Sequence, residues 1–320
     1  MNNIKLIKNR SDIGAGTRGS DMGVDAIEIA AINKENDYFT HFEHFDVETK
    51  NYSVYDKATH AFAKRIEHVL DVCDRLCDAV YVTLSANKFP LVLSGDHSSA
   101  LGSISGMKKA FPNKRIGVVW IDAHADIHSP YTSPSGNIHG MPLAAALSED
   151  NLERQINDLK TETDASWEGL KNLGVKGAKI KHEDIVYFGV RDTEEPEDFV
   201  MQKYGIKNYK VEEVRYRGMD ECMNEAMDRL KKCDLVYISF DVDSMDCDLI
   251  SMGTGTPVSK GFDQYEIIEI IKRVIKTGKV GCFEIVEVNP TLDTKGNVMA
   301  ETAFEVLDET TKHILDTNIK

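Results

Sequence analysis

The sequence has 320 residues, of which 42% are hydrophobic and 28% are charged, the proportions of an ordinary globular protein. With 38 Lys and Arg against 53 Asp and Glu, its net charge is −15, which disfavours nucleic acid or an anionic membrane as the main partner. No apolar run of about 18 residues and no signal-peptide pattern is present, so we expect a cytoplasmic protein. The six cysteines contain no CxxC pair, which disfavours a thiolate zinc site.

Short apolar segments alternate with longer segments of helical period. The apolar runs predict buried strands over 89–95, 115–122, 184–190, 234–241 and 280–288. The helical pattern covers 56–86, 98–111, 217–232, 264–277 and 299–316. This alternation predicts one α/β domain over 1–320, with three layers and a central, mostly parallel sheet flanked by helices. We read 150–183 as a surface excursion with some helix, and the first 55 residues allow no firm assignment.

Polar residues gather where the predicted strands end. Asp122, His124 and Asp126 follow one strand at positions i, i+2 and i+4, which on an extended segment places them on one face, about 6.6 Å apart. Asp241 and Asp243 repeat this spacing after another strand. Since ligands of parallel sheets bind at the carboxyl ends of the strands, these side chains are expected to converge there, together with His97, which follows a third strand.

Six oxygen and nitrogen ligands without sulfur suit two hard divalent ions, above all Mn²⁺, better than a structural zinc. Four carboxylates contribute a charge of −4, which two divalent ions balance, whereas bare carboxylates in one cleft would repel each other. Each short motif alone is more often a turn, a cap or a hydrogen-bonded loop. Their joint occurrence at strand ends, with Ser135, Asn137 and His139 close behind, favours a two-metal site.

Six motifs in this order are similar to those of the ureohydrolases, the arginase and agmatinase family. They are SGDHS (94–98), WIDAHADI (120–127), SGNIHGMP (135–142), SFDVDSMD (239–246), GTGTPV (253–258) and EVNP (287–290), and they resemble arginase most. The resemblance implies the arginase-like α/β fold, two Mn²⁺ ions per chain, and hydrolysis of the guanidinium group of L-arginine to L-ornithine and urea. The nucleophile it implies is a hydroxide that bridges the two metals.

The resemblance also implies the role of each matching residue. The metal ligands would be His97, Asp122, His124, Asp126, Asp241 and Asp243, with Asp122 and Asp241 bridging the ions. Asp126 would also orient the hydroxide and accept its proton, His139 would shuttle a proton to solvent, and Glu287 would pair with the substrate guanidinium. Ser135 and Asn137 would face the α-carboxylate of the substrate and Asp192 its α-amino group, and Thr256 would line the metal cleft.

Two positions depart from the usual arginase pattern. Glu194 stands where arginases carry an Asp two residues beyond Asp192, and it is long enough to reach a substrate ammonium directly or through water. His128 stands where arginases usually carry an Asn, and if protonated it would attract the substrate carboxylate; an ordinary surface histidine is an equally good interpretation. Both changes could alter the preferred substrate.

Several alternatives therefore stay open. The same chemistry could act on agmatine, another guanidino acid or formimidoylglutamate, although Ser135 and Asn137 argue against agmatine, which has no carboxylate. A deacetylase-type amidohydrolase would use one zinc and fewer acidic ligands, and a non-catalytic subunit would have lost some of the ligands. The partners expected are a small guanidino substrate and other copies of this chain, as a trimer or hexamer.

Overall fold

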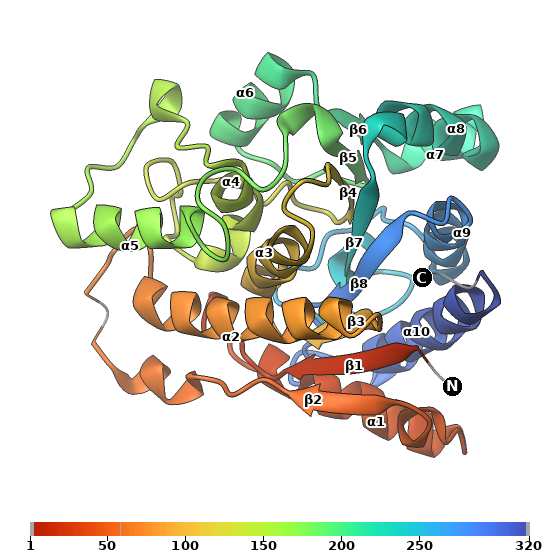
Figure 1. Ribbon diagram of the computed structural model, residues 1–320. Coiled ribbons are helices and arrows are strands. Elements are labelled where there is room, and N and C mark those ends of the chain that lie inside the picture. Colours follow the sequence, from red (N-terminus) through yellow and green to blue (C-terminus); the bar gives the residue numbers. More distant parts are fainter. Residues whose placement is uncertain (1–2, 58, 318–320) are drawn as a thin grey trace.

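The computed structural model describes residues 3–57 and 59–317. Within these residues a parallel sheet of eight strands runs in the order β2-β1-β3-β8-β7-β4-β5-β6 (Figure 1). The strands are β1 (Ile4–Asn9), β2 (Glu43–Asp46), β3 (Phe89–Ser94), β4 (Ile116–Ile121), β5 (Ile185–Phe188), β6 (Lys207–Tyr209), β7 (Leu235–Asp241) and β8 (Val280–Val286).

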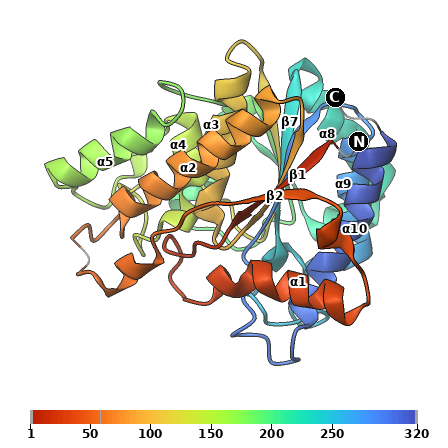
Figure 2. The ribbon, with the colours of Figure 1, turned by 60° about the horizontal axis from the view of Figure 1, so that its bottom comes forward.

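Helices cover both faces of the sheet, as Figure 2 shows with the sheet near edge-on. One layer contains α2 (Ile66–Ser85), α3 (Ala100–Ala110), α4 (Pro142–Leu147) and α5 (Thr161–Lys171). The opposite layer contains α1 (Gly23–Asn33), α8 (Met219–Arg229), α9 (Gln264–Ile275) and α10 (Val298–Asp316). The shorter helices α6 (Glu195–Tyr204) and α7 (Val211–Arg217) lie near the β5–β6 edge.

The strand sequences explain why both faces are covered. In β4 every residue is buried, and alternate side chains enter different hydrophobic clusters. Val118 and Trp120 pack toward α2 and α3, whereas Val119 and Ile121 pack toward α9 and α10. Because successive side chains of a strand point to opposite faces, a continuous apolar run needs a helical layer on each side.

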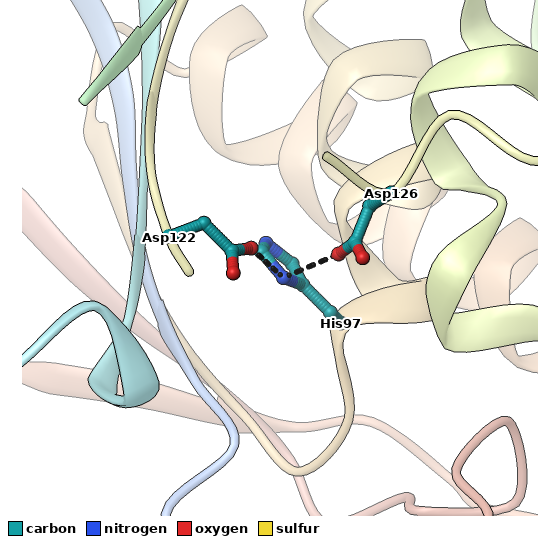
Figure 3. Close-up of side chains that lie close together, drawn as sticks. All are labelled: His97, Asp122 and Asp126. Carbon is teal, nitrogen blue, oxygen red and sulfur yellow. Dashed lines mark ion pairs between the residues drawn. The ribbon is translucent and has the colours of Figure 1, made fainter. Parts of the chain in front are cut away.

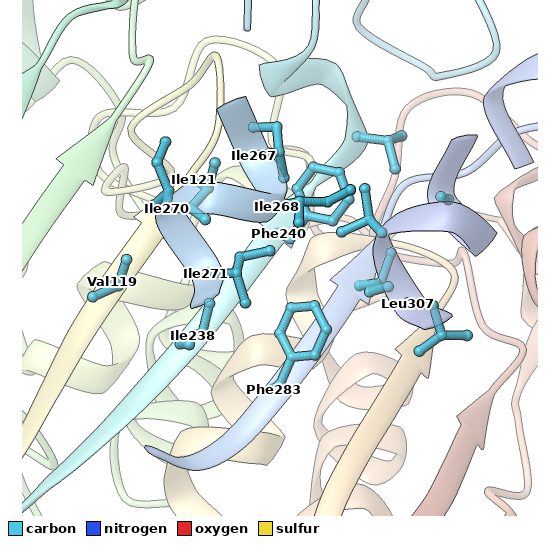
Figure 4. Packing of buried hydrophobic residues seen from close by; sticks show 14 of the residues in the cluster. Val119, Ile121, Ile238, Phe240, Ile267, Ile268, Ile270, Ile271, Phe283 and Leu307 are labelled. Carbon is cyan, nitrogen blue, oxygen red and sulfur yellow. The ribbon is translucent and has the colours of Figure 1, made fainter. Parts of the chain in front are cut away.

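Helix α9 shows how a helix of the outer layer packs against the sheet. Ile267, Ile270 and Ile271 are fully buried against the sheet, where Figure 4 shows them beside Phe240 and Phe283. The helix begins with a capping box, in which Asp263 accepts a hydrogen bond from the backbone of Glu266 and the Glu266 side chain accepts one from Asp263. The start of the helix and its apolar face thus follow from local sequence.

The predicted strands and the three-layer fold are confirmed, and the sheet is all-parallel rather than mostly parallel. The prediction of a helix from residue 56 was wrong, because α2 begins at Ile66, directly after Arg65 in the left-handed conformation (φ 57°); residue 58 lies outside the described part. The excursion 150–183 does contain a helix, α5. The sequence analysis missed β1, β2 and β6, of which β2 is exposed throughout and β6 spans three residues.

Across the described residues, no helix combines the length and the apolar character that crossing a bilayer requires.

Candidate metal and substrate site

A cavity of about 300 Å³ opens at the carboxyl ends of the central strands. Its walls include most of the predicted site residues: His97, His124, Asp126, His128, Ser135, Asn137, His139, Asp192, Glu194, Asp241, Asp243 and Thr256. The other two predicted residues, Asp122 and Glu287, are buried beneath this lining and contact it through His97. The fold therefore brings all the predicted residues into one region.

At the base of the cavity, three carboxylates surround one imidazole nitrogen. His97 Nδ1 lies 3.1 Å from an oxygen of Asp122, 2.9 Å from one of Asp126 and 3.1 Å from one of Asp241. Figure 3 shows Asp122 and Asp126 approaching this ring from two sides. The other ring nitrogen, Nε2, lies 2.7 Å from Ser239 Oγ, to which it can donate its hydrogen. In that tautomer the Nδ1 lone pair faces the carboxylates.

A second group shares Asp122 with the first. His124 Nδ1 lies 3.0 Å from an oxygen of Asp243 and 3.6 Å from the second oxygen of Asp122. Ligand atoms of His97, Asp122 and Asp126 all lie within 4.8 Å of one another, and so do those of Asp122, His124 and Asp243. Asp122 thus presents one oxygen to each group, which is the arrangement of a bridging carboxylate.

These donors fit divalent cations by their own chemistry. His97 Nδ1 is buried and makes no hydrogen bond, although carboxylate oxygens surround it. Burial, together with the negative charges of Asp243 and Asp122, raises the pKa of Asp241 well above its usual value. Burial and the charge of Asp122 likewise raise the pKa of Asp126 to about 6. Carboxylates packed this closely are costly without positive charge between them, which a cation supplies.

Backbone and side-chain donors hold these carboxylates in place. The oxygens of Asp122 accept hydrogen bonds from the Trp120 indole (2.9 Å) and from the backbone of His124 (2.7 Å). The Trp120 ring also stacks on His97, with ring centres 4.1 Å apart. Asp126 has a positive φ of 49°, a conformation that costs free energy for a residue with a side chain and that the surrounding contacts must hold in place.

Glu287 and His139 form a buried pair beside the first group. Glu287 Oε1 lies 3.0 Å from His139 Nδ1 and accepts a hydrogen bond of 2.9 Å from the backbone of His97. Burial lowers the pKa of His139, but the hydrogen bond to Glu287 outweighs it, and the resulting pKa is about 9. Like Asp126, Glu287 has a positive φ (67°), which fixes its carboxylate at the end of β8.

Within the same cavity lining, the two residues that depart from the arginase pattern contact each other. His128 Nε2 lies 2.5 Å from Glu194 Oε2 and 3.6 Å from Glu197. Burial lowers the pKa of His128, which speaks against the expectation that its ring is a cation for the substrate carboxylate. Glu197 is buried, and its pKa is raised to about 8 by that burial and by the charge of Asp126.

The residues predicted for substrate recognition lie around the mouth. Asp192 is two-thirds exposed, and its carboxylate lies 3.7 Å from His124 Nε2. Thr256 donates a hydrogen bond of 3.0 Å to Asp243, so it positions a carboxylate of the second group. Ser135 Oγ accepts a hydrogen bond from the backbone of Asn137 (3.2 Å) in the loop that precedes His139.

Two residues that shape the site, Glu197 and Ser239, were not predicted from the sequence. Glu197 forms a capping box with Glu194 at the start of α6, and the spacing of the two glutamates around Pro196 is the signal that would have revealed it. Ser239, which contacts His97 Nε2, lies within β7 and opens the motif SFDVDSMD (239–246), in which no role was assigned to it.

Comparisons with known proteins agree with this geometry. The sequence model described as the arginase family matches residues 3–312. An arginase of Bacillus subtilis is 35% identical over 307 residues, covering 95% of this chain and 96% of the relative. Arginase-1 of Homo sapiens is 37% identical over 221 residues, covering 68% of this chain and 64% of the relative.

Solved structures show the same fold. The native structure of arginase from Bacillus caldovelox superposes with a TM-score of 0.82 at 33% identity, covering 97% of this chain and 98% of that one. A formimidoylglutamase from Bacillus subtilis shares the fold at 18% identity, with a TM-score of 0.73 and coverage of 98% and 88%. The named relatives in this set are mostly arginases, hydrolases that act on an amidine C–N bond. By sequence and by fold, this chain belongs to the arginase family.

Proposed function

We propose that this protein is an arginase that hydrolyses L-arginine to L-ornithine and urea with two Mn²⁺ ions. The observation that carries the proposal is the pair of His/Asp groups that share Asp122 at the base of a cavity, next to the buried carboxylate of Glu287. The arginase names of the relatives support L-arginine as the substrate, as do Ser135 and Asn137 in the cavity lining, which we propose to bind its α-carboxylate.

The proposed ligands divide into two overlapping sets. The first ion would be held by His97, Asp122, Asp126 and Asp241, and the second by Asp122, His124, Asp241 and Asp243. When bound, two adjacent divalent cations supply a water of lowered pKa, and so a hydroxide nucleophile near neutral pH. Oxygen and imidazole donors without thiolate suit Mn²⁺.

The chain's own residues would orient the substrate and move protons. Glu287 accepts the planar guanidinium through charge-assisted hydrogen bonds and so holds its carbon over the base of the cavity. Asp126 is placed to accept the proton of the attacking water and to pass it toward the leaving amine. His139, bonded to Glu287 and one-fifth exposed, links this region to solvent and can carry a proton outward.

At the mouth, the amino-acid part of the substrate would meet two kinds of groups. Ser135 and Asn137 offer hydrogen-bond donors to the α-carboxylate, whereas Asp192 and Glu194 offer negative charge to the α-ammonium. A decarboxylated substrate such as agmatine would leave the first set without a partner, which costs binding free energy.

The decisive experiment measures urea release from purified, Mn²⁺-loaded protein with L-arginine, agmatine and guanidinobutyrate, and with an EDTA-treated control. We expect turnover that strongly favours L-arginine and disappears with the metal. A metal content near two manganese ions per chain would exclude the single-zinc, deacetylase-type reading. Bound manganese without urea from any of the three substrates would overturn the proposal.

A second candidate substrate class rests on the contact between His128 and Glu194. Because Glu194 is engaged by His128, the mouth differs from the usual arginase pattern, and another guanidino or formimino compound such as formimidoylglutamate could be preferred. Ammonia or formamide release from formimidoylglutamate in the same preparation tests this alternative.

The resemblance to arginases further predicts a homo-oligomer, a trimer or a hexamer. Light scattering on the purified protein measures its mass directly, against 35.8 kDa for one chain.

A further inference from the structure

The cavity has an unusual charge distribution for a pocket that would receive a carboxylate. Six acidic side chains line it: Asp126, Asp192, Glu194, Glu197, Asp241 and Asp243. Among the described lining residues there is no Lys or Arg. Metal ions can offset the acids at the base, but an α-carboxylate at the mouth would meet no Lys or Arg within this lining, so a positive charge just outside it would favour carboxylate binding.

Lys64 is attached to the mouth by two contacts. Its backbone N–H donates to the carbonyl of Gly136 at 2.7 Å, and its ammonium donates to Asn137 Oδ1 at 3.3 Å. Within the described part of the chain, this is the one side-chain hydrogen bond that the Lys64 ammonium makes, and no carboxylate neutralises it in an ion pair. Lys64 therefore holds an uncompensated positive charge directly behind Asn137.

The surrounding backbone fixes this arrangement. Gly136 has a φ of +71°, and a Cβ at this position would lie 2.2 Å from the carbonyl oxygen of Ala61, so the two loops touch without an intervening side chain. The Asn137 amide nitrogen lies over Gly16, where a Cβ would approach it to 2.5 Å. Arg65, which follows Lys64, donates to the carbonyls of Ile13 and Ala15 and ties the segment to the N-terminal loop.

The hydrogen bond from the Lys64 ammonium to Asn137 determines which group of the Asn137 amide is available to a ligand. Because the ammonium has only donors, it must face the amide oxygen, and this leaves the amide N–H groups of Asn137 free to donate to a ligand. A neighbouring cation also makes those N–H groups more favourable partners for an anion.

We propose that Lys64 is a positioning residue for carboxylate recognition: it orients the Asn137 amide and supplies the positive charge that the acidic cavity lacks, so that the site selects α-carboxylate-bearing guanidino substrates. This inference rests on the proposed arginase function and deepens it. Lys64 is not among the residues that line the cavity, and it acts on substrate binding through Asn137.

The test compares Lys64→Met, Lys64→Gln and Lys64→Arg with the parent, using L-arginine and agmatine as substrates. In Lys64→Met we expect the KM for L-arginine to rise about 2- to 5-fold, the size of a partly exposed charge interaction, with kcat unchanged. Agmatine kinetics should not change. Lys64→Arg should restore the parent KM, and Lys64→Gln, which keeps a donor but no charge, should fall between the two.

The salt dependence of KM and a matched control variant distinguish the loss of the Lys64 charge from a structural disturbance of the loop. The KM difference between parent and Lys64→Met should shrink between 50 and 500 mM NaCl because salt screens the charge. Lys57→Met removes an exposed lysine from the same segment and should leave both substrates unaffected. An unchanged KM for L-arginine in Lys64→Met, or equal losses for L-arginine and agmatine, would overturn the inference.

Binding calorimetry keeps this test separate from that of the proposed function. L-ornithine carries the carboxylate and putrescine lacks it, and neither measurement needs turnover. A parent that releases no urea from L-arginine defeats the proposed function, whereas weaker ornithine binding in Lys64→Met with unchanged putrescine binding still supports the role of Lys64. Equal ornithine affinity in parent and variant defeats the role of Lys64 alone.

Discussion

The ring of His128 and the carboxylate of Glu194 meet at the wall of the cavity, with Nε2 2.5 Å from Oε2. These are the two positions at which the sequence departs from the usual arginase pattern, and they come from separate loops. The two departures therefore form one interaction.

The contact predicts that the two positions are energetically coupled. His128→Asn removes the imidazole that contacts Glu194, and Glu194→Asp withdraws the carboxylate from the ring, so each single change should lower kcat/KM for L-arginine. In the double variant both losses come from breaking the same contact. Its fold-loss in kcat/KM should therefore be about 5-fold smaller than the product of the two single fold-losses, which corresponds to a coupling free energy of ~1 kcal/mol. Effects that multiply to within 2-fold would contradict the coupling.

Removing the metal should destabilise the protein, and one substitution should reverse the effect. The crowded carboxylates repel each other without cations, so EDTA should lower the Tm of the parent. Asp241→Asn removes one negative charge and should raise the Tm of the EDTA-treated protein while abolishing the stabilisation by added Mn²⁺.

Metal analysis by mass spectrometry provides the independent readout. We expect about two manganese ions per chain in the parent, because the proposed ligands form two sets that share Asp122 and Asp241. We expect fewer ions in Asp243→Ala, which lacks one of these ligands. Asp126→Ala and Asp243→Ala should lose nearly all turnover. Their far-ultraviolet circular dichroism spectra should match that of the parent, because the fold is kept. Full metal content with full activity in Asp243→Ala would contradict the ligand assignment.

Lys179, which does not line the metal-site cavity, gives a separate pH dependence. Burial lowers the pKa of this lysine to about 8, from its usual value of 10.5. The unfolded chain then binds more protons than the folded chain between pH 8 and pH 10.5, so this group makes the folded state more stable as pH rises through that window. Below pH 8 its destabilising effect is fully present.

Lys179→Met removes this contribution. The free energy of unfolding of the parent, measured relative to the variant by urea titration, should increase by about 1 kcal/mol from pH 7 to pH 9. A difference in the free energy of unfolding between the two proteins that stays constant over this range would show that the pKa of Lys179 is not lowered in the folded state.

The layer formed by α9 offers a matched pair for stability. Ile271 is fully buried against the sheet, whereas Tyr265 of the same helix is 71% exposed. Ile271→Ala should lower the free energy of unfolding by about 2 to 5 kcal/mol because it leaves a cavity, and Tyr265→Ala should change it by less than about 0.5 kcal/mol. Denaturant titration of both variants checks the prediction, and similar losses would place the helix differently from Figure 4.

Much of the fold was predictable because its signals are local. Continuous apolar runs such as 116–121 require cover on both faces, which by itself indicates a sheet between two helical layers. The edge strand β2 escaped prediction since its residues are all exposed and it is held by backbone pairing with β1 and by ion pairs such as those of Glu43 with Lys88 and of Asp46 with Arg10. Such pairing depends on a distant segment and leaves no periodic pattern.

The sequence by itself determined the chemistry of the site, because the spacing of Asp122, His124 and Asp126 and the polar residues at the strand ends identify the donor groups. Only the tertiary structure decided how those donors are shared between two groups, that His128 engages Glu194, and that Lys64 stands behind Asn137. The physical reason is that spacing along a strand fixes which face a side chain occupies, whereas contacts between loops depend on how separate strand ends are brought together by the sheet.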